Sequence, residues 1–372
     1  MDSDRLSNVD VEELERILEK QPKNVAAYVL MGNCLEKMGM PQQALEQYRK
    51  AAQLAPNDLT TIKAVAKFEL SHGQNNAAHV LLTDSLRRYS NDPELIYLFG
   101  FYCTNVNELS EAKQLLERAI DMSPHIPGLA AKLAEVYLKL GRYQGAYQTA
   151  NMAVEFEPQD PQGHMIKGIA LSKLGYYSQA TRPLSMAYTH MPYNPEVAKQ
   201  LALSLNWSGS YEIALEPALM YLATEASLGR KIRPPQILLM ELLRKIPEKK
   251  SRRLIREFSQ ELEGSTPNAP YRVALGQVVD EIGMHDIAVE CYRAALQTQP
   301  NNPTALFLLG KDLELIYGKY EDALLCYAKA EQIAPYNTDI ADYHLRLQER
   351  LAHRQQDIAW QLRDWLTSLV RH

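Results

Sequence analysis

The 372 residues carry a net charge of −5, with 23% charged and 46% hydrophobic residues. These values are ordinary for a folded soluble protein, and the charge is too small to indicate a partner. The four cysteines show no CxxC pair and no metal-ligand spacing, which is typical of reduced residues in the cytosol. No secretory signal pattern opens the sequence, and no apolar run approaches the length of a membrane span. We therefore expect a cytoplasmic protein without a membrane span.

The first 24 residues are predicted to be an N-terminal segment and a capping helix. We expect disorder in residues 1–9 and a helix from Val11 to Lys20. Asp10 can cap this helix, and Pro22 ends it. Such a helix would cover the end of the structure that follows.

Residues 25–228 are six copies of one 34-residue unit. Every copy has an alanine at its twentieth position, and five copies have a glycine at the fifteenth, with Asn107 in the remaining place. The alanines are Ala44, Ala78, Ala112, Ala146, Ala180 and Ala214. The glycines are Gly39, Gly73, Gly141, Gly175 and Gly209. A fixed period of this length marks a repeat array, which grows by stacking neighbours rather than by enlarging one core.

Each copy reads as two helices. In the first copy, Tyr28 and Met31 lie on one helical face because they are three residues apart. Gly39 stops that helix, since glycine readily takes the left-handed conformation of a helix C-terminus. Ala44 and Tyr48 lie on the apolar face of the second helix. The eighth position of every copy is Gly or Ala, which lets the two helices pack closely.

The pattern of Tyr28, Gly32, Ala44, Tyr48 and Pro56 resembles the tetratricopeptide repeat family, and six consecutive copies match it in register. The resemblance implies an all-α fold, a right-handed superhelical solenoid of helix-turn-helix repeats. It also implies a protein that binds other proteins.

The pattern changes after residue 228. We interpret 229–268 as a basic insertion and a degenerate repeat, with helices near 236–246 and 247–263. Residues 269–337 match two further repeats, the second of them one residue longer. Residues 338–372 contain neither Gly nor Pro, and their apolar residues recur three, four or seven apart. This spacing predicts one long C-terminal amphipathic helix.

No motif for catalysis, a cofactor or a metal is visible. The nine histidines are scattered, and none lies in HExxH or in a Cys/His cluster. The phosphate-binding, dinucleotide-binding and nucleophile-elbow motifs are absent as well. We therefore expect no enzyme activity, no cofactor and no metal site.

The groove expected of a tetratricopeptide array is the first candidate for a site. In this family, positions 2, 5, 9, 12 and 13 of each first helix line the concave surface. Several of them hold side chains that packing within a repeat does not need, which suggests a partner. The predicted groove residues are Tyr97, Phe101, Met165, Ile169, Leu203, Asn206 and Trp207. The alternative is that these residues contact the neighbouring repeat or are covered by the chain's own terminus.

One specialised groove of the family is not assembled. Members that bind chaperone tails use a carboxylate clamp of Lys and Asn in successive first helices. Asn33 matches one clamp position, but Val29 and Ala64 stand where a Lys and a second Asn are needed. We therefore do not expect a chaperone-tail adaptor.

Residues 230–256 are locally basic, with ten basic residues against two acidic ones. The basic residues are Arg230, Lys231, Arg233, Arg244, Lys245, Lys249, Lys250, Arg252, Arg253 and Arg256. Such a block can contact an acidic protein, nucleic acid or an anionic membrane, or it can be a solvated charged face. Aromatic residues do not interleave with it, so nucleic acid is the weaker choice.

The C-terminal helix is the third candidate, because its start suffices to cap the last repeat and the remainder is still apolar. The predicted contact residues are Ile358, Trp360, Leu362, Trp365, Leu366 and Leu369. They could bind the chain's own groove, a second copy or a partner, and we favour a partner or self-association.

Together these features predict a non-enzymatic scaffold or adaptor. It would hold a peptide, a helix or a partner subunit in its concave groove while a larger complex assembles. The alternative is a regulatory subunit of an enzyme or nucleic-acid complex, contacting an acidic partner through residues 230–256.

Overall fold

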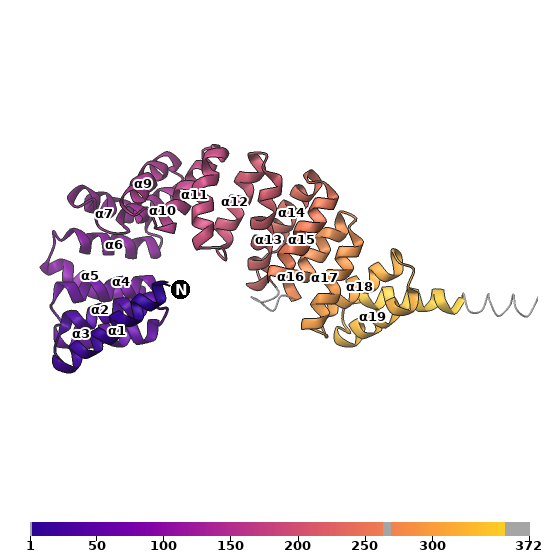
Figure 1. The fold of residues 1–372 in the computed structure, drawn as a ribbon, viewed down its shortest axis with the longest axis horizontal. Coiled ribbons are helices and arrows are strands. Elements are labelled where there is room, and N and C mark those ends of the chain that lie inside the picture. Colours follow the sequence, from indigo (N-terminus) through magenta and orange to yellow (C-terminus); the bar gives the residue numbers. More distant parts are fainter. Residues whose placement is uncertain (1, 263–268, 354–372) are drawn as a thin grey trace, which may run out of the picture. The chain divides into compact units, whose positions relative to one another are not determined.

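The computed structural model describes residues 2–262 and 269–353, with side chains from 11 to 260 and from 269 to 353 (Figure 1). Within these residues every regular element is an α-helix. The chain divides into two compact units, Met1–Tyr176 and Tyr177–His372, which we call the first and the second unit. In both, successive helices form helix-turn-helix pairs, which confirms the predicted all-α repeat fold.

The first unit begins with α1 and continues as helix pairs that stack on one another. Its helices are α1 (Asp2–Lys20), α2 (Val25–Lys37), α3 (Pro41–Leu54), α4 (Leu59–Ser71), α5 (Asn75–Arg88), α6 (Pro93–Asn105), α7 (Leu109–Met122), α8 (Leu129–Lys139), α9 (Tyr143–Phe156) and α10 (Pro161–Lys173). The sequence prediction was wrong at its start, because α1 begins at Asp2 and includes residues 2–9. Nothing from Asp2 to Lys20 is Gly or Pro, so no residue interrupts the helix, and Asp10 lies inside it.

The second unit contains the remaining pairs. Its helices are α11 (Tyr177–His190), α12 (Pro195–Trp207), α13 (Tyr211–Ser227), α14 (Arg233–Lys245), α15 (Glu248–Leu262), α16 (Ala269–Glu281), α17 (His285–Thr298), α18 (Pro303–Leu315) and α19 (Tyr320–Ile333), followed by a helix over 338–353. Helices α14 and α15 are the two helices expected for the degenerate repeat. Helix α13 has 17 residues and packs against α12, α14, α15 and α16. It is buried around most of its circumference, which explains its almost continuous apolar sequence.

Helix ends follow from a few residues. Asp92, Asp160 and Asn194 each accept backbone N–H groups of the next helix, and each precedes a proline at the first helical position. Left-handed residues end the first helices, with Gly39 at φ 74° and Asn107 at φ 66°. Asn107 thus takes the conformation of the glycine that it replaces in the repeat, because asparagine tolerates this region better than most residues.

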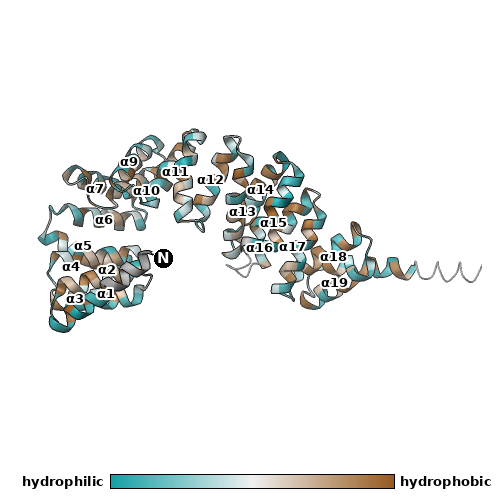
Figure 2. Ribbon diagram, in the orientation of Figure 1, coloured by the Kyte–Doolittle hydropathy of each residue, from teal (hydrophilic) through white to brown (hydrophobic). Residues whose placement is uncertain are grey.

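The core lies between the helices of each pair and between neighbouring pairs. The alanines at the twentieth repeat position are fully buried, as at Ala44 and Ala112. A Cβ atom on Gly32 would lie 2.6 Å from the Tyr48 ring, so only glycine allows this approach. Figure 2 shows hydrophobic and hydrophilic residues alternating along the helices of both units, as in amphipathic helices. Within the described part of the chain, no helix is long and apolar enough to cross a membrane.

Candidate interaction surface

Trp207 is the most conspicuous predicted groove residue. It is the last residue of α12, and 66% of its surface is exposed. Its ring stacks on Tyr177 of α11, with ring centroids 5.6 Å apart and an interplanar angle of 19°. The stack holds the indole in one orientation while leaving most of it in water.

Residues near Trp207 in the sequence are also apolar. Leu203 lies one helical turn earlier and is half-buried. Ile213 near the start of α13 is 67% exposed, and Lys245 lies over the Tyr211 ring at 4.9 Å. Ile213 and Tyr211 belong to a second helix, whereas the repeat pattern assigns the groove to first helices.

Phe101 of α6 is a predicted groove residue of the first unit. Its ring is half-buried, and Lys132 Nζ of α8 lies 4.0 Å from its centroid. Lys132 and Lys139 both pair with Glu135, at 2.8 and 2.7 Å. Burial opposes ionisation of Glu135, but the two lysines outweigh it and hold the pKa of its carboxyl below the usual value. This side of α6 and α8 therefore combines one aromatic ring with an ordered row of charges.

Three predicted groove residues offer little surface. Tyr97 is 4% exposed and Ile169 is 9% exposed. The Tyr97 hydroxyl is close to Gly128, since a Cβ atom added to this glycine would lie 3.0 Å from the hydroxyl oxygen. Asn206 is buried, receiving a hydrogen bond from Lys245 at 2.9 Å and donating one to Glu241 at 3.0 Å. Tyr97 and Asn206 therefore contact neighbouring segments, which was the alternative interpretation of the sequence pattern. Met165 is half-buried.

Most of the basic residues in 230–256 have acidic partners. Seven of the ten make ion pairs: Arg230, Arg233, Lys245, Lys250, Arg252, Arg253 and Arg256. Several partners lie outside the block, such as Glu281, Asp286 and Glu290. Among the described residues, Lys231, Arg244 and Lys249 form no ion pair. The excess charge counted in the sequence window is therefore largely neutralised by adjacent helices.

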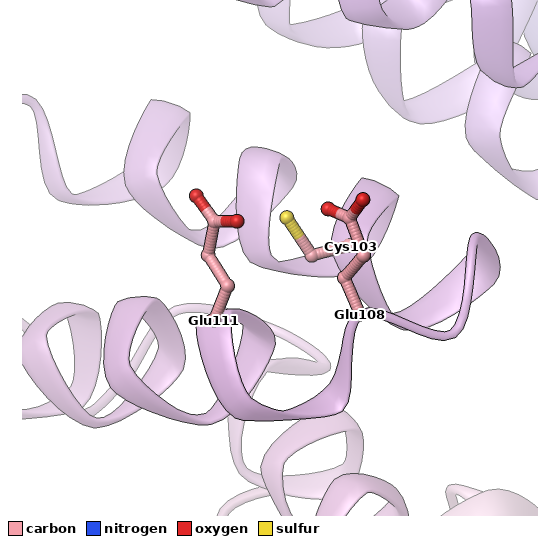
Figure 3. A group of neighbouring side chains, drawn as sticks. All are labelled: Cys103, Glu108 and Glu111. Carbon is pink, nitrogen blue, oxygen red and sulfur yellow. The ribbon is translucent and has the colours of Figure 1, made fainter.

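A thiol and two carboxylates meet at the turn between α6 and α7. Figure 3 shows Glu108 and Glu111 facing the sulfur of Cys103. Burial, and then the two carboxylates, raise the pKa of the Cys103 thiol to about 12. A metal needs the thiolate, whereas this environment favours the protonated thiol. We therefore assign no metal to this group.

Models of the tetratricopeptide repeat match residues 25–58, 106–169 and 273–338. The chain belongs to the tetratricopeptide repeat family. It is 26% identical to anaphase-promoting complex subunit 7 of Dictyostelium discoideum over 164 residues, covering 44% of this chain and 28% of that protein. It is 24% identical to BBSome complex member BBS4 of Mus musculus over 124 residues, covering 33% and 24%. The chain thus spans less than a third of the length of either relative.

Among solved structures, a chain of the APC/C hetero-tetramer Cut9-Hcn1 is similar, with 16% identity and a TM-score of 0.48. The match covers 91% of this chain and 58% of that one.

Asn33 is the residue that matches one position of the carboxylate clamp. Its side-chain oxygen accepts a hydrogen bond from the Tyr48 hydroxyl at 2.7 Å. The side chain therefore serves the packing of its own repeat. The six predicted contacts of the C-terminal helix, Ile358 to Leu369, lie outside the described residues.

Proposed function

We propose that this tetratricopeptide protein is a non-enzymatic interaction scaffold, which binds a peptide or helix of a partner subunit across its first helices. The observation that carries the proposal is the exposed, stacked indole of Trp207. A tryptophan that is mostly in water, yet held in one orientation, is suited to insert into a partner. Phe101 is the contact that we propose for the first unit.

The energetics favour Trp207 as an anchor. Burying a large apolar side chain contributes about 1.5–3 kcal/mol, and tryptophan is enriched among residues that dominate binding energy. Because Tyr177 already orders the ring, little rotamer entropy is lost on binding. Several such contacts are needed to offset the cost of association, which is about 4–15 kcal/mol. A shallow apolar face of this kind therefore suits a partner of micromolar affinity.

The relatives support the assembly part of the proposal. Both are described as members of multi-protein complexes, the anaphase-promoting complex and the BBSome. We propose that this chain likewise works as a complex subunit, with one or more proteins as partners. No observation favours the alternative of an acidic partner on residues 230–256, since most of those side chains are paired within the chain.

The test is the substitution Trp207→Ala in the full chain. Tagged wild-type and variant proteins are used to capture partners, which are quantified by mass spectrometry. We expect the variant to capture at least about tenfold less of each specific partner than the wild type does. A tenfold change in affinity is equivalent to about 1.4 kcal/mol of binding free energy. Tyr336→Ala is the matched control, because Tyr336 is a 97% exposed aromatic outside the first helices. Equal capture by wild type and Trp207→Ala, with unchanged circular dichroism, would reject the proposal.

A further inference from the structure

Asp280, His285 and Asp312 meet in the second unit, where α16 ends, α17 begins and α18 passes. His285 Nδ1 lies 2.7 Å from Asp280 Oδ1 and 4.0 Å from Asp312 Oδ1. One donor atom from each residue can be chosen so that all three lie within 4.8 Å of one another. Two repeats contribute, because Asp312 belongs to the repeat after the one that holds Asp280 and His285.

Asp312 is the unusual member. Only 3% of the residue is exposed, and its Oδ2 atom has no hydrogen-bond partner in the described structure. A buried carboxylate oxygen without a donor is costly, and such a group calls for a bound proton, water or cation.

Comparison with equivalent repeats reveals a second unpartnered group. In two other repeats the tyrosine of the second helix donates a hydrogen bond to the carboxylate at position 12, from Tyr48 to Glu36 at 3.3 Å and from Tyr327 to Glu314 at 3.0 Å. Tyr292 and Asp280 occupy these positions in the repeat between 269 and 302. The Tyr292 hydroxyl is buried and has no partner among the described residues.

The difference has a chemical cause. Asp280 is one methylene shorter than the glutamates of the other repeats, and its carboxylate is directed to His285 instead of the tyrosine. The Tyr292 ring nevertheless keeps the family position, because it lies against Gly276 as Tyr48 lies against Gly32. Its hydroxyl therefore lies near the Asp280 and Asp312 carboxylates. Two buried oxygens, one on Tyr292 and one on Asp312, thus have no hydrogen-bond partner in the described structure.

We propose that Asp280, His285 and Asp312 bind one divalent transition-metal cation, with Zn²⁺ as the best fit. Carboxylate oxygens and an imidazole nitrogen are donor types that zinc accepts, and water would complete four-coordination. The nitrogen donor disfavours Mg²⁺ and Ca²⁺, which select oxygen ligands. Ligand atoms of tetrahedral zinc are about 3.4 Å apart, given metal–ligand distances of about 2.0–2.2 Å. The observed 2.7 and 4.0 Å lie on either side of that value, so small side-chain movements suffice.

In this arrangement, the Tyr292 hydroxyl would donate a hydrogen bond to the Asp280 carboxylate and orient it, as groups that hydrogen-bond to metal ligands do. The cation would tie α18 to the turn between α16 and α17 and so join two consecutive repeats. No sequence pattern indicates the site, because its ligands are five and 27 residues apart along the chain and form no known motif.

The test uses the full chain, freed of metal with a chelator and titrated with Zn²⁺ by calorimetry. We expect one saturable site in the wild type. Asp312→Asn, which keeps the side-chain shape, should bind Zn²⁺ at least about tenfold more weakly. Even the loss of a group that only hydrogen-bonds to a metal ligand lowers metal affinity about 10–100-fold. Zn²⁺ should also raise the melting temperature of the wild type but not that of Asp312→Asn, because the metal binds only the folded chain.

Two further variants make the result decisive. Glu108→Gln alters the other three-residue group, at α6 and α7, and should bind Zn²⁺ as the wild type does. If Asp312→Asn does not fold, His285→Gln is tested in its place, because the His285 side chain is partly exposed. Absence of a saturable site in the wild type, or equal binding by wild type and His285→Gln, would overturn the proposal and leave a shared proton between the carboxylates.

Discussion

At the scale of single residues, the eighth position of a repeat shows how sequence controls packing. Gly32 of α2 lies so close to the Tyr48 ring that an added Cβ atom would be only 2.6 Å away. Gly145 of α9 is also helical, but an added Cβ atom there would meet Tyr137 at an ordinary 3.5 Å. Two glycines in similar helices therefore have different reasons to be there.

Gly32→Ala and Gly145→Ala should change stability in opposite directions. The first overpacks the pair of α2 and α3 and should cost about 1–3 kcal/mol. The second removes a flexible residue from a helix without a clash and should stabilise by about 0.5–1 kcal/mol. Urea unfolding measures whether each substitution raises or lowers the free energy of unfolding. Hydrogen exchange should accelerate near residues 25–54 in Gly32→Ala only. The same sign for both variants would contradict this account of position eight.

Residue-scale prediction succeeded where the cause is local and failed where it is not. Asn107 replaces a repeat glycine, and its positive φ follows from the repeat pattern alone. The burial of Tyr97 depends on the chain near Gly128, and that of Asn206 depends on side chains of α14. Neither neighbour is visible in the periodicity of the helix that carries the residue. A repeat pattern therefore predicts the face on which a side chain lies, but not what covers it.

At the scale of elements, α8 has charges that stabilise its own surface. Lys132, Glu135 and Lys139 are three and four residues apart and so lie on one face of the helix. Lys132 also contacts the ring of Phe101. Loss of the central carboxylate would leave the two lysines without their common partner.

Glu135→Gln should therefore destabilise the protein in a pH-dependent way. The pKa of Glu135 is lowered in the folded chain, so its ionised form stabilises the fold above the unfolded pKa of about 4.3. That contribution is lost as the pH falls through the lower folded value. The urea midpoints of wild type and variant should differ at pH 7 and converge as the pH falls below about 4. Glu46→Gln on the exposed side of α3 is the control. A difference between the urea midpoints of wild type and Glu135→Gln that grew as the pH fell would contradict the predicted direction.

The same reasoning applies to α14 and α15, which a sequence window made appear strongly basic. Arg252 pairs with Asp286, and Arg256 pairs with both Asp286 and Glu290, so ion pairs join α15 to α17. Arg252 and Asp286, like Arg256 and Glu290, are 34 residues apart, one repeat length, and are thus brought together by stacking. Counting charges along one segment misses partners that lie one repeat away. Exposed pairs of this kind contribute little individually, about 0–1 kcal/mol, and they mainly remove free charge from the surface.

At the scale of the whole molecule, the fold was predictable because each repeat contacts mainly its neighbours. The 34-residue period indicated the helix pairs of both units, including the degenerate pair of α14 and α15. The interaction surface and the proposed metal site were harder to predict. The Trp207 ring stacks on Tyr177 of the preceding helix, and Asp312 lies close to His285 of the preceding repeat. Such sites arise from particular departures from the repeat, which a common pattern does not contain.

The C-terminal residues lead to the last prediction, which rests on the sequence alone. Trp360 and Trp365 are two of the three tryptophans in the chain, and leucines accompany them at helical spacing. An exposed helix has no use for so much apolar surface, so a partner or a second copy is expected to cover it. Arg350, Arg354 and Arg363 alternate with acidic or polar residues, unlike a membrane-surface helix, whose polar face is usually rich in Lys and Arg.

Deletion of residues 356–372 should therefore leave the repeats folded while changing self-association or complex formation. Circular dichroism and the melting temperature should stay close to those of the full chain, because Ile340 and Leu347, buried at the end of the last repeat, are retained. Light scattering should show a lower molar mass, or partner capture should fall. The double substitution Trp360→Ala and Trp365→Ala, which keeps the chain length, should have the same effect. An unchanged mass and unchanged capture, together with a large fall in melting temperature, would instead mean that the segment only caps its own repeats.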